Sequence, residues 1–261
     1  MIKFSVITVC LNAGNYLHET IKSTLMQTYR NFEIIVKDGY STDGSIENVS
    51  NDARIRLIQK KDTGIYDAMN QGIDAATGDY LVFMNAGDLF YANTVLQEVA
   101  EKIEKNRYDL YYGRCYNRLL DVVDPAPSKL TKYFCYRSMI CHQATFYARA
   151  MLKNRGYDIS YHVSADRERM LHAIIREKVS SEYLSTIIVS FQGGGFCTTD
   201  KAKKLLIDEQ KRMKKTYFSK SERMRYVIAH EITLPHIREK VLKNPKIKKT
   251  YRTMIAKIYR N

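Results

Sequence analysis

One stretch of the chain, residues 62–88, constrains the fold more than any other part. A break at Thr63–Gly64 is followed by apolar residues at helical spacing, which predict a helix. A second break at Thr77–Gly78 ends that helix, and the continuous apolar run over residues 80–84 predicts a strand buried on both faces. A helix that leads directly into a doubly buried strand is typical of an α/β sheet covered by helices on both faces.

The helix predicted in this stretch has an apolar face and a polar face. Asp67 and Asn70 are three positions apart and share the polar face, beside Tyr66. The turn over residues 85–88 then leaves the sheet at the C-terminal end of a strand, where open α/β sheets bind their ligands. Asp88 in this turn either caps the next helix or binds a hard cation beside a phosphate. The expected buried stripe of the helix consists of Ile65, Met69, Ile73 and Ala76.

The preceding segments repeat the alternation of strand and helix. Apolar runs and helical periodicity predict a parallel sheet with right-handed crossovers. Neither GxGxxG nor GxxxxGK[ST] is present, which disfavours a dinucleotide-binding Rossmann site and a P-loop kinase. The expected strands are Phe4–Val9, Phe32–Val36 and Ile55–Ile58, with helices over Tyr16–Gln27 and from Ser45.

Positive charge is concentrated at the end of the chain. The 261 residues carry a net charge of +14, and residues 200–261 hold 19 Lys and Arg against 6 Asp and Glu. This asymmetry favours a basic appendage that meets an anionic surface, and it disfavours a nucleic-acid partner bound in a basic groove. Five cysteines without a CxxC pair predict reduced thiols in a cytosolic protein without a zinc site.

Three segments resemble the nucleotide-sugar-binding half of family 2 glycosyltransferases. They read TVCLNAGNYLHETIKSTLMQTY, FEIIVKDGYSTDGS and DTGIYDAMNQGIDAATGDYLVFMNAGD, and the likeness extends over residues 3–90. It is greatest to bacterial enzymes that build extracellular or surface polysaccharides. The resemblance implies an α/β fold of the GT-A type, Rossmann-like, with a mostly parallel central sheet. It also implies a nucleotide-sugar donor, usually a UDP-sugar, and a divalent cation, Mn²⁺ or Mg²⁺.

The same resemblance assigns the donor site. Two positions depart from the family pattern: Gly39 stands where many members have a second acid, and Asn85 replaces the first acid of the DxD segment. Asp88 is then the one charged metal ligand of that segment, completed by donor phosphates and water. The positions that match the family's nucleotide-sugar-binding residues are Thr8, Cys10, Asn12, Asp38, Tyr66, Asp67, Asn70, Asn85, Ala86 and Asp88.

Two later motifs resemble the acceptor half of the same family. In the segment 141–147, His142 and Gln143 are expected to line the sugar or acceptor pocket, and a structural histidine is the alternative for His142. In the segment 164–168, Asp166 is expected to be the catalytic general base, with an N-cap aspartate as the alternative and Glu168 as the substitute base. The glycines at 193–195 either cover the donor phosphates or form a turn.

We therefore expect a GT-A domain over residues 1–199, with a nucleotide-sugar-binding half at 1–90 and an acceptor half at 91–199. A basic helical extension follows at 200–261. The expected reaction is an inverting, metal-assisted transfer from a UDP-sugar to a saccharide or lipid-linked saccharide in surface polysaccharide synthesis. The alternatives are a non-catalytic nucleotide-sugar-binding relative, because of Asn85, and a sugar nucleotidyltransferase, which would need a Gly-rich basic phosphate loop near its start.

The extension suggests where the protein acts. Apolar and basic residues over 246–260 alternate as in an amphipathic cationic helix, which suits an anionic membrane surface. The same pattern also fits a helix that packs its apolar stripe on the core. We expect a cytoplasmic protein, and, on the first interpretation, one held peripherally at the inner face of the cell membrane.

Overall fold

The protein is described here by a computed structural model that covers residues 1–47, 49, 51–193 and 200–233. Nine strands in these ranges form one sheet, whose main path runs β3-β2-β1-β4-β8-β6-β9-β5. Its first part is parallel and comprises β1 (Phe4–Cys10), β2 (Phe32–Asp38), β3 (Ile55–Gln59) and β4 (Tyr80–Phe83). This half agrees with the parallel sheet predicted from the sequence.

The second half of the sheet is mixed. Strand β8 (Thr145–Ala148) is antiparallel to both β4 and β6 (Leu110–Asn117). Strand β9 (Ser181–Phe191) runs parallel to β6 and pairs with the short β5 (Leu89–Phe90), which places the end of β9 beside the turn that follows β4. The remaining strand, β7 (Val122–Asp124), lies off this path and pairs with the end of β6.

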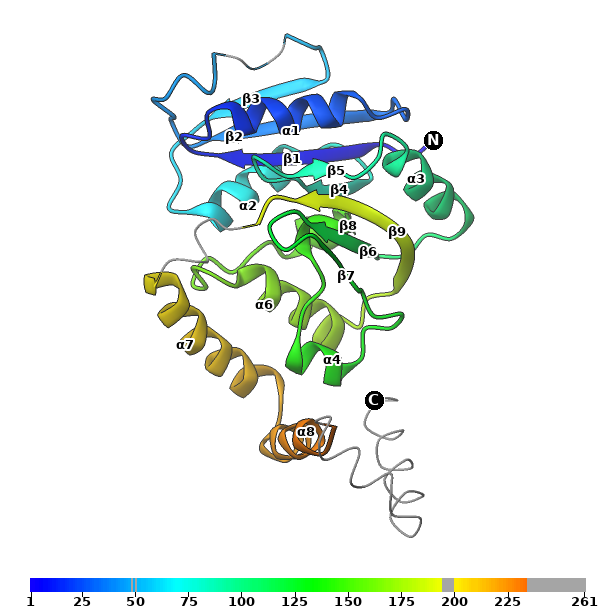
Figure 1. The fold of residues 1–261 in the computed structure, drawn as a ribbon, viewed down its shortest axis with the longest axis vertical. Helices are drawn as coiled ribbons and strands as arrows, with labels where there is room; N and C mark the ends of the chain where they lie inside the picture. The colour runs from blue at the N-terminus through cyan, green and yellow to red at the C-terminus, as the bar shows by residue number, and fades with distance from the viewer. Residues whose placement is uncertain (48, 50, 194–199, 234–261) are drawn as a thin grey trace.

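Alternate residues of the strands feed two hydrophobic cores on opposite faces of the sheet. Phe4 and Val6 of β1 pack into one core with α1 (Asn15–Leu25) and α3 (Val95–Lys105). Ile7 and Val9 enter the other core, which contains the apolar sides of α2 (Ile65–Ala75), α4 (Lys132–Arg137), α5 (Arg149–Asn154) and α6 (Ala165–His172). Figure 1 shows the sheet between these helices. The predicted α/β class, with helices on both faces, is confirmed.

Two local predictions were wrong. The expected helix from Ser45 is a turn, because Ser45 bonds back to Asp43 Oδ1 through its backbone nitrogen (3.0 Å) and its hydroxyl (2.6 Å). The predicted buried stripe of α2 included Ile65, but this side chain is 41% exposed, whereas Tyr66 is buried. Ile65 is the first residue of the helix and lies on its exposed side, whereas Tyr66 and Ala68 of the same turn pack in the core.

The described part of the basic extension packs against the body of the protein. It forms α7 (Asp200–Tyr217) and α8 (Lys220–Thr233). Tyr226 of α8 lies in ring contact with Tyr133 and Tyr136 of α4, at 5.3 and 5.2 Å between centroids. Figure 1 shows α7 crossing beside α6, with α8 at the far end of the molecule. The amphipathic helix expected over 246–260 lies outside the described residues.

Thr20 of α1 anchors the turn that follows β4. Its buried hydroxyl accepts a hydrogen bond from Gly87 N (2.9 Å) and donates to the backbone oxygen of Asp88 (2.9 Å). Thr20→Val keeps the shape of the side chain but leaves these buried backbone groups short of a partner. We expect the variant to lose about 1–3 kcal/mol of unfolding free energy in denaturant titrations.

The matched control for this prediction is Thr24→Val, one turn further along α1 and equally buried. The Thr24 hydroxyl donates to the Thr20 carbonyl (3.0 Å), which the helix already uses. We expect Thr24→Val to cost less than about 1 kcal/mol. Equal losses for the two variants would show that Thr20 contributes only as an ordinary helix residue.

Candidate active site

Three cavities adjoin one another at the C-terminal ends of β1 and β4. The strand-end cavity, of about 450 Å³, lies directly over these ends, and the His142 cavity, of about 650 Å³, continues from it toward α6. The loop cavity, of about 730 Å³, lies beside the loop over residues 62–64. Ile65 lines all three, while Asn85 and Phe191 line the first two. The site is therefore one continuous cleft with three parts, at the edge predicted from strand order.

Asp88 lies in the wall of the strand-end cavity and joins three segments that are distant in sequence. Its Oδ1 accepts a hydrogen bond from Gln192 N (2.9 Å), directly after β9. Its Oδ2 accepts one from Gln143 Nε2 (3.2 Å), in the short helix η1 (His142–Ala144). Arg118 bonds the carbonyl of the neighbouring Gly87 and contributes positive charge nearby. Asp88 thus connects the first 90 residues of the chain with the segments around residues 143 and 192.

Gly87 is required for this geometry. Its φ of +98° lies in the region that only glycine adopts readily, and an added Cβ would lie 1.8 Å from Gln192 Oε1. Any side chain at this position would be strained by the positive φ and would displace the Gln192 side chain. The N-x-G-D pattern of the sequence therefore has a steric origin.

The residues of the 85–88 turn fit a divalent cation. Burial raises the pKa of the Asp88 carboxyl from 3.8 to about 6, despite hydrogen bonds from Gln192 and Gln143 and the charge of Arg118. Asn85 Oδ1 is also buried and has no hydrogen-bond partner among the described residues. A carboxylate short of counter-charge and an unused amide oxygen are hard oxygen ligands of the kind that Mg²⁺ and Mn²⁺ take. Within the described ranges, no three His, Cys, Asp or Glu side chains form a metal cluster.

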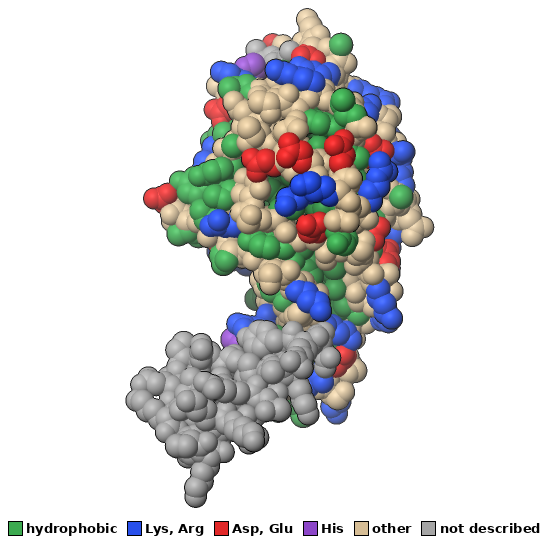
Figure 2. Space-filling view, turned by 90° about the vertical axis from the view of Figure 1, so that its right-hand side faces the viewer, with side chains coloured by type: hydrophobic (Ala, Val, Ile, Leu, Met, Phe, Trp, Pro, Cys, Tyr) green, Lys and Arg blue, Asp and Glu red, His purple; other side chains and the backbone are tan. Residues whose placement is uncertain are grey.

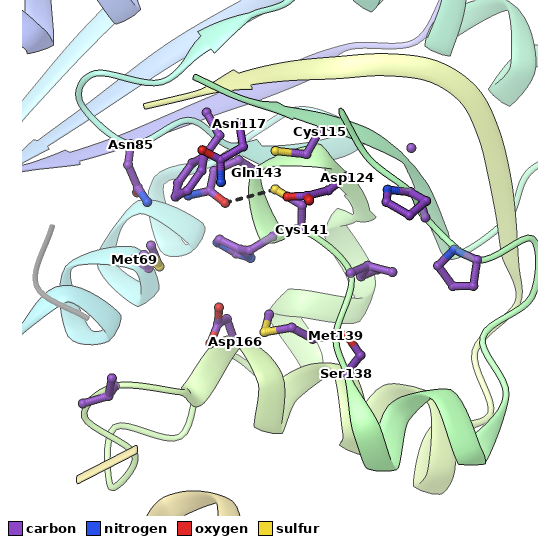
Figure 3. A pocket seen from close by; sticks show the side chains of 18 of the residues that line it. Met69, Asn85, Cys115, Asn117, Asp124, Ser138, Met139, Cys141, Gln143 and Asp166 are labelled. Atoms are coloured by element: carbon purple, nitrogen blue, oxygen red, sulfur yellow. Dashed lines mark hydrogen bonds between the residues drawn. The ribbon is translucent and has the colours of Figure 1, made fainter. Parts of the chain in front are cut away.

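Asp166 projects into the His142 cavity from the start of α6. Its Oδ1 accepts a hydrogen bond from Arg167 N (2.8 Å) and lies 3.0 Å from the Tyr66 hydroxyl, which is also 3.0 Å from Val163 O. Within the described residues, Oδ2 makes no hydrogen bond. Figure 3 shows Asp166 at the floor of the cavity, across from Asn85 and Gln143. One carboxylate oxygen is thus held in place while the other remains available to a bound molecule.

Glu168, the alternative base, is not available for this role. It is buried, its two oxygens accept hydrogen bonds from Arg155 at 2.8 and 3.0 Å, and it is bonded by the Tyr217 hydroxyl. It is also absent from the lining of the three cavities. The geometry therefore favours Asp166 over Glu168.

His142 is buried in an aromatic surround within the cavity named after it. Its ring stacks on Phe83 at 4.8 Å between centroids, and Nδ1 lies 3.2 Å from the Tyr147 hydroxyl. Burial lowers the pKa of His142, only partly opposed by the charge of Asp166, so the ring is neutral at physiological pH. Its Nε2 is buried and has no hydrogen-bond partner in the described part of the chain. That nitrogen remains free to bond a ligand in the cavity.

Asp38 is the last residue of β2 and Asn12 lies in the loop after β1, and both side chains bond the loops that follow these strands. Burial opposes ionisation of Asp38, but hydrogen bonds from Ser41 and others outweigh it and hold the pKa below its usual value. The Asn12 side chain accepts a bond from Thr42 N (2.9 Å) and so stitches the two loops together. Gly39 follows Asp38, and a Cβ there would lie 3.1 Å from Asp62 Oδ2. The missing second acid therefore coincides with a position that Asp62 crowds.

The other predicted donor residues are divided between the cavity walls and their supports. Cys10 lines the strand-end and loop cavities, and Ala86 lines the strand-end cavity. Asp67 accepts bonds from Thr63 N (2.8 Å) and Thr63 Oγ1 (3.1 Å), which shapes the loop before α2. Asn70 bonds both backbone groups of Tyr157, at 2.8 and 2.9 Å. Asp67, Asn70 and the fully buried Thr8 are absent from the lining of the three cavities.

Several lining residues were missed from the sequence. Tyr16 and Gln192 line the strand-end cavity, and Asn117 and Cys115 line the His142 cavity. Gln192 precedes the glycine cluster at 193–195, a signal that could have indicated it; residues 194 and 195 lie outside the described ranges. The other three carry no local signal, and for Asn117 and Cys115 only the pairing of β6 with β8 and β9 brings that strand to the cleft.

Comparison with known proteins identifies the family. The sequence model described as Glycosyl transferase family 2 matches residues 5–166. The chain belongs to this family. A PGL/p-HBAD biosynthesis glycosyltransferase of Mycobacterium tuberculosis is 34% identical over 205 residues, covering 75% of this chain and 79% of that protein. An uncharacterized glycosyltransferase of the same species is 35% identical over 179 residues, covering 66% of this chain and 68% of its own.

Solved structures share the fold of this glycosyltransferase. S. aureus TarS 1–349 in complex with UDP-GlcNAc matches with a TM-score of 0.66 at 16% identity, covering 98% of this chain and 80% of that chain. The mannosyltransferase PcManGT from Pyrobaculum calidifontis, in complex with GDP-Man and Mn²⁺, matches with a TM-score of 0.58 at 14% identity, covering 98% and 86%. The predicted GT-A fold is thereby confirmed.

The raised pKa of Asp88 predicts a pH dependence of stability. The folded protein holds this proton more tightly than the unfolded chain, so the resulting stabilisation is complete below pH ~4 and lost as the pH rises through ~6. Asp88→Asn removes the titration and the buried charge. In metal-free buffer at pH 8, we expect the variant to exceed the wild type by roughly 1–3 kcal/mol of unfolding free energy.

The measurement is denaturant unfolding of both proteins between pH 4 and 8, with Asp208→Asn as the control for a lost surface charge. The difference between Asp88→Asn and the wild type should grow between pH ~4 and ~6 and then stay constant. A difference that is independent of pH would contradict a shifted pKa at Asp88.

Proposed function

We propose that this family 2 glycosyltransferase moves a sugar from a UDP-sugar to a saccharide or lipid-linked saccharide with inversion at the anomeric carbon. The observation that carries the proposal is the position of Asp166. It faces the His142 cavity, which shares Ile65, Asn85 and Phe191 with the strand-end cavity beside Asp88. A base in one cavity and a cation-compatible carboxylate in the next suit a single displacement between acceptor and donor.

The chemistry requires two tasks from the protein. The acceptor hydroxyl oxygen forms a bond to the anomeric carbon while the bond from that carbon to the diphosphate oxygen breaks. The hydroxyl proton passes to Asp166 Oδ2, the oxygen without a hydrogen bond in the described residues, because a neutral hydroxyl is a poor nucleophile. Tyr66 and Arg167 N hold the other oxygen, so the carboxylate is oriented before the acceptor arrives.

The leaving diphosphate would lie in the strand-end cavity. A divalent cation held there by Asp88 and Asn85 would neutralise charge on the leaving group. Gln192 N and Gln143 keep the Asp88 carboxylate in one orientation. The complex of PcManGT with GDP-Man and Mn²⁺ supports the cation, and the UDP-GlcNAc complex of TarS supports a UDP-linked donor. The loop cavity, between Leu11 and the 62–64 loop, would then hold the nucleoside.

The names of similar proteins support a role in building molecules of the bacterial cell surface. The 34% identical mycobacterial protein is named for PGL/p-HBAD biosynthesis, and TarS supports the fold. Together with the resemblance to polysaccharide-building enzymes, this favours an acceptor destined for the bacterial cell surface. A non-catalytic nucleotide-sugar-binding relative, suggested by Asn85, remains the alternative and would bind the donor without cleaving it.

The decisive experiment is a panel of UDP- and GDP-sugars screened by thermal shift with and without Mn²⁺. The donor giving the largest shift is then incubated without an acceptor, and release of free nucleotide is measured. Cleavage supports an enzyme that uses water as a slow acceptor. Binding without cleavage, in the presence of Mn²⁺ and of oligosaccharide acceptors, would support the non-catalytic alternative.

Asp166→Asn tests the general base. The substitution keeps the size of the side chain but cannot accept the proton, so we expect turnover to fall by ~10²–10⁴-fold. The affinity for UDP, measured calorimetrically, should stay within about threefold of the wild type, because Asp166 lines the neighbouring cavity. Near-wild-type turnover would exclude Asp166 as the base.

We further propose that the basic extension docks on an anionic membrane surface at the inner face of the cell membrane. On α8, Met224, Val227 and Ile228 are exposed at helical spacing, with Arg223 and Arg225 beside them. Figure 2 shows mostly Lys and Arg among the charged side chains at the lower end of the molecule, where α7 and α8 lie. None of the helices in the described part of the chain combines the length and apolar character that a bilayer crossing needs.

Vesicle co-sedimentation tests this docking. We expect the full-length protein to bind phosphatidylglycerol vesicles and not phosphatidylcholine vesicles. Replacing Met224, Val227 and Ile228 by Asp should reduce binding at least about tenfold, because three apolar contacts are lost. Leu119→Asp/Leu120→Asp, on an equally exposed turn elsewhere, is the control. Unchanged binding of the α8 variant would contradict the proposal.

A further inference from the structure

We propose that Glu209 of α7 is a positioning residue for Asp166, so that the basic extension forms part of the catalytic apparatus. The inference rests on the general-base role proposed for Asp166. Nothing in the sequence pattern indicates Glu209, which lies among lysines and arginines in a segment that reads as a solvated basic helix. The structure instead buries its side chain beside the start of α6.

The Glu209 carboxylate binds the backbone that leads into Asp166. Oε1 accepts a hydrogen bond from His162 N (2.6 Å). Oε2 accepts from Val163 N (3.2 Å), Ser164 N (3.0 Å) and Ser164 Oγ (2.6 Å). Three consecutive backbone donors and one hydroxyl therefore converge on one carboxylate. Such charge-assisted bonds are roughly twice as strong as neutral ones, and they are stronger still away from water.

This carboxylate lies just before the N-terminus of α6. Ser164 is the N-cap residue of that helix, but its side chain makes no capping bond to the helix backbone. The hydroxyl is turned to Glu209 instead, and the negative charge lies where the helix dipole favours it. Glu209 thus binds the N-cap residue and the two residues before it, and so fixes where α6 begins.

A second residue on the same face of α7 contacts the loop before α6, at residues 160 and 161. Arg212, three residues after Glu209, donates to Ser160 Oγ at 2.8 Å, and its guanidinium lies 4.1 Å from the Tyr161 ring centroid. By contrast, the side chain of the neighbouring Asp208 is 69% exposed and pairs with Lys211 on the surface. Glu209 therefore differs from Asp208 in that its carboxylate is buried and binds the backbone before α6.

Residues 162–164, the segment that Glu209 binds, form part of the walls of two cavities. His162 lines the loop cavity, and Val163 and Asp166 line the His142 cavity. Val163 O also lies 3.0 Å from the Tyr66 hydroxyl that orients Asp166. Movement of residues 162–164 would therefore shift both Asp166 and its orienting partner. A displacement of the order of 1 Å at a reacting group can cost about 10²-fold in rate.

The test uses the full-length protein and release of UDP from the donor selected in the panel. Glu209→Gln keeps the length of the side chain but turns an NH₂ group toward backbone donors. We expect kcat to fall about 10–100-fold and the donor KM to rise by a smaller factor, because His162 also lines the loop cavity. Ser164→Ala, which removes only the hydroxyl, should lower kcat less and in the same direction. Asp208→Asn, the same chemical change one residue away, should leave kcat at the wild-type value.

The double variant separates positioning from general destabilisation. If Glu209 acts through Asp166, Glu209→Gln should add little to the loss already caused by Asp166→Asn. A full additional 10–100-fold loss in that background, or a Glu209→Gln protein with unchanged kcat, would overturn the inference. A loss of donor affinity as large as the loss of kcat would also overturn it. Full activity of Asp166→Asn alone would instead refute the general-base role on which the inference rests.

Discussion

The site depends on burying one carboxylate, that of Asp88, between segments that begin far apart in the chain. The turn after β4 supplies the side chain, η1 and the end of β9 supply its hydrogen-bond donors, and Thr20 of α1 supports the turn from below. The raised pKa of Asp88 reflects the unfavourable free energy of keeping its ionised carboxylate away from water. A buried carboxylate of this kind is poorly stabilised alone, and the cation proposed above would supply the counter-charge that it lacks.

Much of the fold could be predicted from the sequence because its signals are local. Short runs rich in apolar residues marked the four parallel strands, and the breaks around α2 marked its ends within one or two residues. The strand order then placed the 85–88 turn at the ligand-binding edge. The segment after β2 was predicted to begin a helix at Ser45, but the bond from Ser45 back to Asp43 closes a turn there. The spacing of apolar residues does not distinguish a turn from the start of a helix in this segment.

The site was predictable in part. Asp88, Asp166, His142 and Gln143 lie around the same cavities, since each lies directly before a regular element or in the first turn of one. Asn70 and Asp38 were assigned to the ligand, but their side chains bond the protein, which sequence spacing cannot distinguish from ligand binding. Glu209 could not be found at all, because its partners lie 45–47 residues away and are mostly backbone groups, which leave no mark in a sequence.

The walls between the three cavities have a consequence for how such enzymes diversify. Ile65, Asn85 and Phe191 each face more than one part of the cleft. A substitution at one of these positions reshapes both neighbouring parts, so under the proposed function the choice of sugar and the choice of acceptor would be coupled. Changes confined to a single cavity, such as those at Asn117 or Tyr16, escape this coupling. New specificities should therefore arise first at residues that line a single cavity. Substitutions at Ile65, Asn85 and Phe191 would alter more than one cavity at once.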